Sequence, residues 1–183
     1  EGAYEFTSRS DEYDGELFYR AEDRRKLHPS LIQPTITSAY DWVRASLELK
    51  QAFAYNERNK QLRLRGFVGT FLWKRDGGRI ENLQGWGLTW GPEDMMYDHG
   101  YFERGATHGA MSRQFNKQQG GFKTPFGAGG SDTWIASANM ELDLPFKLPI
   151  ALFASAGIVP RKLVTVDGVS ESTITYFEAG VGV

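Results

Sequence analysis

The residues of this chain that could do chemistry are few and widely spaced. The three histidines are His28, His99 and His108, and their spacing does not make a metal-binding set. Asp94, Asp98 and His99 come nearest to a ligand cluster, but a polar surface loop explains them more simply. Zinc hydrolysis needs about three protein ligands and a general base. His-Glu-x-x-His, Gly-x-Ser-x-Gly and phosphate-binding glycine loops are absent from the sequence. We therefore expect no catalytic site, metal or cofactor in this chain.

Glu141 and Asp143 are a possible carboxylate pair, but the stretch around them predicts a β-strand. From Trp134 to Leu144, alternate residues are apolar and, apart from Ile135, the residues between them are polar or charged. A period of two places the two sets on opposite faces of a strand. Glu141 and Asp143 would then be neighbours on its polar face. The prolines that follow indicate a short connection, with a second strand starting near Ile150.

The same alternation predicts a long hairpin between Trp42 and Trp73. Its first arm is apolar at every second position from Val43, and its turn is the polar run 56–60. The alternation weakens after Gly66, where we expect a β-bulge. Five further stretches are candidate strands. They are 16–22, 31–38, 85–90, 105–119 and 173–183, with Gly120-Gly121 interpreted as a turn.

Composition limits the class of protein. A chain of 183 residues is long enough for a single β-barrel domain, and it shows no sustained helical period. The formal net charge of −2 without a basic patch argues against nucleic acid as a partner. The lack of cysteine excludes a disulfide scaffold. The sequence therefore predicts one all-β domain over residues 1–183.

The strand pattern fits two folds of opposite polarity. In a soluble lipocalin-like carrier the apolar face points inward, whereas in an outer-membrane barrel it faces lipid. Three features favour an antiparallel transmembrane β-barrel: strands of about 11–14 residues, charges of both signs on the opposite face, and tryptophans at strand ends. We expect the charged side chains to face the lumen, and these are Arg44, Glu48, Lys50, Arg63, Arg65, Arg104, Glu141, Asp143 and Glu178. The expected membrane-interface aromatics are Trp42, Trp73 and Trp134.

Several stretches carry a family resemblance over roughly residues 45–183. "ASLELKQAFAYNERNKQLRLRGFVGTF", "QQGGFK", "LPFKLPIALFASAG" and "ITYFEAGVGV" together resemble the C-terminal outer-membrane barrel of proteins in the zinc aminopeptidase (aminopeptidase N-like, gluzincin) family of Gram-negative bacteria. "FERGATHG" and "ANMELDLPFKLPIALFASAG" are more distantly similar to the surface-antigen barrels of the outer-membrane assembly-factor superfamily. The resemblance implies a location in the bacterial outer membrane, where the barrel anchors or accompanies a peptidase-like or assembly region.

The resemblance carries no catalytic residue onto this chain. It implies that a full-length protein could hold a zinc metallopeptidase domain outside this segment, and that the partners are the lipid bilayer and other outer-membrane or periplasmic proteins. An alternative is the barrel of an outer-membrane protein insertion machine, in which Arg104-Gly105 would be the only candidate for the arginine-glycine pair of an inward-folded loop. The outward alternation that runs from Phe177 to Val183 does not end on an aromatic residue. We therefore also expect this segment to be the C-terminal part of a larger barrel, with further strands on both sides.

Overall fold

The structure is a computed structural model that describes residues 2–9, 12–25, 27–55, 60–75, 85–88, 119–123, 130–146, 148–165 and 168–182. Side chains are described from Gly15 onward, except those of 161–171. The strands are β1 (Gly2–Arg9), β2 (Glu12–Tyr19), β3 (Ala21–Asp23), β4 (Ser30–Ala39), β5 (Trp42–Ala54), β6 (Gln61–Lys74), β7 (Trp86–Gly87), β8 (Gly130–Ser131), β9 (Trp134–Asp143), β10 (Ala151–Thr165) and β11 (Gly168–Gly182). None of the described residues is helical, so the described chain contains no helix that could cross a membrane.

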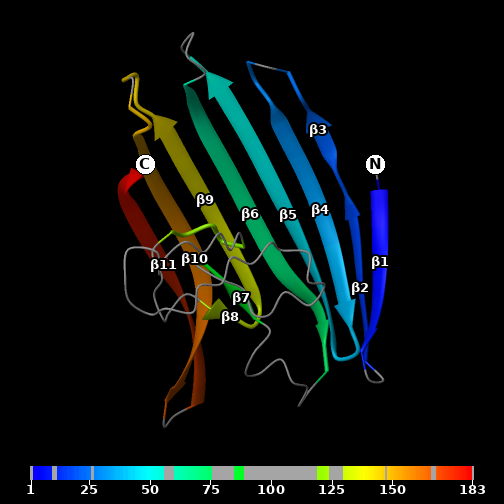
Figure 1. Ribbon diagram of the computed structural model, residues 1–183. Helices are drawn as coiled ribbons and strands as arrows, with labels where there is room; N and C mark the ends of the chain where they lie inside the picture. The colour runs from blue at the N-terminus through cyan, green and yellow to red at the C-terminus, as the bar shows by residue number, and fades with distance from the viewer. Residues whose placement is uncertain are drawn as a thin grey trace.

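Nine of these strands form one antiparallel sheet in the order β1-β2-β4-β5-β6-β9-β10-β11, with β3 also paired to β4 (Figure 1). Most strands pair with the strand that precedes or follows them in the chain, so the sheet is largely a meander. The exception is the pairing of β6 with β9, because the chain between them returns to form β7 and β8, a separate two-stranded ladder. The all-β, antiparallel class predicted from the sequence is confirmed.

The long hairpin is confirmed as β5 and β6, but the predicted bulge at Gly66 is wrong. Gly66 pairs in regular register with Leu49 on β5 and Ala138 on β9. The irregularity lies at the other end of the hairpin, where Val43 pairs with Trp73 and the next residue, Arg44, pairs with Phe71. The extra residue shifts the parity of β6 by one position there, which puts Trp73 on the same side as Val43. Phe67 and Phe71 come before this shift, and they interrupt the alternation because they belong to or pack against the buried core on the opposite side.

Pro34 lies inside β4, and the ladder is interrupted beside it. On one side Pro34 pairs with Leu47 of β5. On the other side, β2 pairing with β4 ends at Thr35, and β3 pairing begins at Ile32. Proline has no N–H to donate to a ladder. The break between β2 and β3 therefore falls where β4 cannot support continuous pairing.

The register defines two faces of the sheet. Partners directly opposite each other point to the same side, and one row across six strands joins Ile32, Leu49, Gly66, Ala138, Ala156 and Phe177. We call this side the apolar face. Its positions on β4, β5, β6 and β9, and on the parts of β10 and β11 with described side chains, carry no charged residue. Its large exposed side chains are Ile32, Ile36, Leu47, Leu49, Phe53, Leu64, Val68, Trp73, Trp134, Met140, Leu152, Ile158, Phe177 and Val181.

The opposite side, which we call the polar face, carries the charged strand residues and also the buried core. Residues 85–88 and 119–123 lie over it, joined by hydrogen bonds from Gly120 N to Gly87 O at 3.0 Å and from Phe122 N to Leu88 O at 2.9 Å. We call these two pieces the covering segments. Their apolar side chains pack on the sheet in one cluster, which consists of Phe67, Trp86, Leu88, Phe122, Ile135 and Val159.

The described sheet has two free edges, because no described pairing joins β1 to β11. The sequence predicted a closed barrel, and closure remains a prediction.

Candidate functional site on the polar face

Eight of the nine charged residues predicted to share a face do so. Lys50 pairs with Arg65, and Arg63 pairs with Glu141, while Glu178 pairs with Ser155 in the same row as Asn139 and Arg65. Arg44, Glu48 and Asp143 lie on this face by the same parity. The ninth, Arg104, lies outside the described residues, as do Asp94, Asp98, His99 and His108.

The centre of the polar face is a network around Arg65. Its Nε donates to Glu48 Oε1 at 2.5 Å, and its Nη1 donates to Asn139 Oδ1 at 3.1 Å. Lys50 Nζ lies 2.9 Å from the other carboxylate oxygen of Glu48. The side chains of Arg65 and Glu48 are largely buried, so solvent screens their interaction less than it would at a surface. Arg65 therefore links β5, β6 and β9 through charged and polar contacts.

A second cluster lies one row away, at the β6–β9 pairing. Arg63 donates to Glu141 at 3.1 Å and to Asp143 at 2.7 Å. Asp143 also accepts the backbone N–H of Gln61 at 3.0 Å. Glu141 and Asp143 therefore hold one arginine between them. An ion-paired carboxylate pair of this kind is a structural link, and it does not present a free acid and base for catalysis.

The second covering segment is bound to this face through polar groups. Arg65 Nη2 donates to Gln119 O at 2.6 Å, and Asn139 Nδ2 donates to Gly120 O at 3.0 Å. Lys123 Nζ lies 2.7 Å from Glu141, and the Lys123 N–H donates to Glu178 at 2.8 Å. Ser155 donates to the same oxygen of Glu178 at 2.9 Å. The polar strand residues are thus partners of a segment distant in sequence.

Glycine is required where this segment approaches closest. Gly121 has a φ of 74°, which side-chain-bearing residues rarely adopt, and a Cβ there would lie 2.6 Å from Arg65 Nη1 and 2.7 Å from Asn139 Oδ1. The sequence interpretation as a turn identified Gly120-Gly121 but gave no contact for it.

The other half of the polar face is apolar and equally close-packed. The ring of Trp86 lies over Gly69, where a Cβ would come within 2.9 Å of it. Leu88 and Phe122 occupy the corresponding space above Gly157 on β10. Ile135, the one apolar residue on the polar parity of β9, is fully buried beneath this cluster. Its exception to the alternation is explained by the covering segments.

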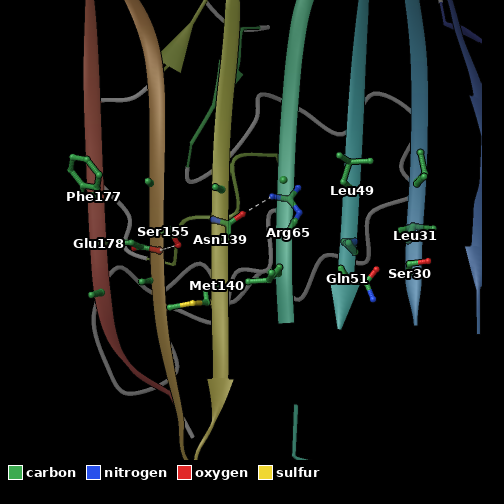
Figure 2. Close-up of a pocket in the computed structure, with 18 residues that line it drawn as sticks. Ser30, Leu31, Leu49, Gln51, Arg65, Asn139, Met140, Ser155, Phe177 and Glu178 are labelled. Carbon is green, nitrogen blue, oxygen red and sulfur yellow. Dashed lines mark hydrogen bonds between the residues drawn. The ribbon is translucent and has the colours of Figure 1, made fainter. Parts of the chain in front are cut away.

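A cavity of about 520 Å³ remains on the polar face beside these contacts. Its lining includes five basic side chains and two carboxylates, which are Arg20, Lys50, Arg63, Arg65, Lys123, Glu22 and Glu141. On the apolar face, a hollow of about 960 Å³ follows the row of small residues Gly66, Ala138 and Ala156. Its lining extends from β4, where Figure 2 labels Ser30 and Leu31, to Phe177 on β11.

The three predicted interface aromatics do not behave alike. Trp73 and Trp134 are exposed at strand ends. Trp42 is 1% exposed, packs edge-on against Phe71 at 6.0 Å, and lies on the polar face. This burial does not fit an interfacial position for Trp42. The interfacial position was predicted from the location of Trp42 at the end of a strand, and the face of the sheet to which its side chain points was not considered.

The sequence interpretation also missed Asn139, Ser155, Lys123 and Trp86 as members of the site. The only available signal was the position of Asn139 and Ser155 on the polar parity of their strands; the contacts of Lys123 and Trp86 depend on how a distant segment folds back. Among the described residues, no group of three or more His, Cys, Asp or Glu side chains is placed to hold a metal ion. No protein-family model, curated protein or solved structure matches the chain.

Proposed function

We propose that this chain is a β-barrel segment of the bacterial outer membrane, which anchors or accompanies a peptidase-like or assembly region and holds no catalytic site of its own. The observation that carries the proposal is the exposed apolar face across six neighbouring strands, which carries no charged residue at the positions whose side chains the structure describes. A contiguous apolar surface of this extent is rare on soluble monomers. A bilayer is the environment in which it is stable.

The lengths of the strands support the same proposal. β5 has 13 residues, β6 has 14, and β10 and β11 have 15 each, whereas a tilted strand needs about 9–11 residues to cross a bilayer. An unpaired strand edge exposed to lipid costs several kcal/mol for each unsatisfied backbone group. Closure of the sheet into a barrel would remove this cost, because the free edges of β1 and β11 would then be hydrogen-bonded.

The soluble lipocalin-like alternative is less well supported. It would need the apolar face to enclose a ligand, yet the packed cluster around Ile135 and Trp86 lies on the polar face. The insertion-machine alternative also places this chain in a membrane barrel. It differs from the anchor only in the part of the protein that lies outside this segment.

Two experiments test the proposal. Refolding the chain with lipid vesicles should give protein that floats with the lipid in a density gradient and resists urea extraction; a protein that stays monomeric in buffer without detergent would contradict the membrane assignment. The anchoring role is tested separately by intact-mass and sequence analysis of the native protein. A zinc-peptidase motif in it supports the anchor, whereas tandem small α/β repeats would favour the insertion machine.

A further inference from the structure

Arg44 differs from the other arginines on the polar face. Its guanidinium carbon lies 4.8 Å from the ring centre of Trp42 and 4.9 Å from that of Trp86, so the two indoles flank it. Its Nε is buried, and no described residue accepts a hydrogen bond from it. In contrast, Arg63 and Arg65 each donate to carboxylates.

The neighbouring Trp86 has the same deficiency. Its Nε1 is buried and has no acceptor among the described residues. The ring itself is held in place by Phe67 at 5.8 Å, by Phe71 at 5.9 Å and by the close approach to Gly69. Buried hydrogen-bond donors almost always have an acceptor, and a buried donor without one costs about 1–3 kcal/mol. Two such donors in one contact point to a missing acceptor.

We propose that Arg44 and Trp86 form a binding site for an oxyanion group, a carboxylate or a phosphate. Both side chains can only donate, so the partner must accept. Because Arg44 carries a full positive charge, an anionic acceptor gains a charge-assisted hydrogen bond that a neutral one does not. An oxyanion has several acceptor oxygens and can therefore serve both donors at once.

The charged groups near the site are few. Glu16 of β2 lies in the same cross-strand row, separated from Arg44 by Thr37, and attracts Arg44 electrostatically without a hydrogen bond to Nε. Lys74 lies 5.3 Å from the ring centre of Phe71, but its Nζ is ion-paired with Asp132 at 3.3 Å. The positive charge that would bind an anion is therefore that of Arg44 itself, and Glu16 opposes the binding.

The test is a titration monitored by NMR of the indole N–H groups. The protein has five tryptophans, and Trp86→Phe identifies the Trp86 resonance while keeping an aromatic ring. In detergent-solubilised protein, sodium phosphate and sodium acetate are each added against sodium chloride at constant ionic strength. We expect the Trp86 N–H resonance to shift and to saturate with at least one anion; saturation with phosphate, acetate or both supports the site and identifies which source it accepts.

Variants separate this site from non-specific binding. Arg44→Gln should raise the anion concentration at half-saturation about tenfold or more, since it removes a charge-assisted hydrogen bond. If the glutamine variant does not fold, Arg44→Lys, which keeps the charge, is measured in its place, and its half-saturation should also move to a higher anion concentration. Arg63→Gln is the matched control and should leave the Trp86 shift unchanged. A linear shift of all five indoles, no shift at all, or saturation that survives Arg44→Gln would mean an adventitious ion only. The measurement is independent of vesicle flotation, so either proposal can fail without the other.

Discussion

Arg65 on β6 and Glu48 on β5 form a hydrogen-bonded ion pair in which both side chains are only 15% exposed. They are diagonal neighbours, because Arg65 pairs directly with Lys50 and Glu48 pairs with Phe67. The same arginine holds Gln119 of the covering segment. One side chain therefore connects the stability of the sheet to the position of the segment that covers it.

Removing the charge of Glu48 should be costly. Glu48→Gln should lower the free energy of unfolding by about 1–3 kcal/mol, because it leaves Arg65 without its carboxylate in a poorly screened position. Lys50→Gln removes the more exposed partner and should cost less than about 1 kcal/mol. Urea unfolding in lipid vesicles measures both. Equal effects of the two variants would contradict the role given to Arg65.

Arginine substitutions should distinguish the two faces. Leu47→Arg and Leu49→Arg place a charge on the apolar face and should each cost about 2–4 kcal/mol near the bilayer midplane. Lys50→Arg adds no charge on the polar face and is the matched control. Folding yield in vesicles is the measurement, and equal tolerance on both faces would remove the membrane interpretation.

A disulfide should form between the first covering segment and β10. The chain has no cysteine, so Leu88→Cys with Gly157→Cys is an isolated pair. A Cβ at Gly157 would meet the Cδ atoms of Leu88, so two cysteines at these positions would direct their sulfur atoms into the same space, as a disulfide requires. Ile158→Cys with Leu88→Cys is the control, because Ile158 points to the apolar face. Mass spectrometry after mild oxidation should find the bridge in the first pair alone; a bridge in neither pair or in both would show that the segment is not docked as described.

Zinc removal should not affect this chain. Residues 1–183 alone should release no product from aminoacyl substrates, with or without added zinc, since the sequence lacks a spaced ligand set and general base. A fluorogenic aminopeptidase assay with a chelator control measures this. Zinc-dependent cleavage that the chelator abolishes would reveal a site.

The strands were predictable because a period of two is a local property of the sequence. β5, β9 and the face shared by Arg63, Glu141 and Glu178 follow from alternation alone. The contacts of the covering segments were not predictable, because Lys123 meets Glu141 and Trp86 meets Gly69 only after the chain between β6 and β9 folds back. Ile135 shows the difference: an exception in the pattern proved to be a core residue.

The most direct test of the membrane assignment is a single-cysteine scan along β9, from Ile135 to Leu142, with a polarity-sensitive fluorophore on each cysteine. Bilayers containing lipids with quenchers at mid-chain should quench labels at Ala136, Ala138 and Met140 strongly and labels at Ser137, Asn139 and Glu141 weakly. We predict this period of two, with the apolar parity in lipid. Uniform quenching along the strand, or none at any position, would contradict it.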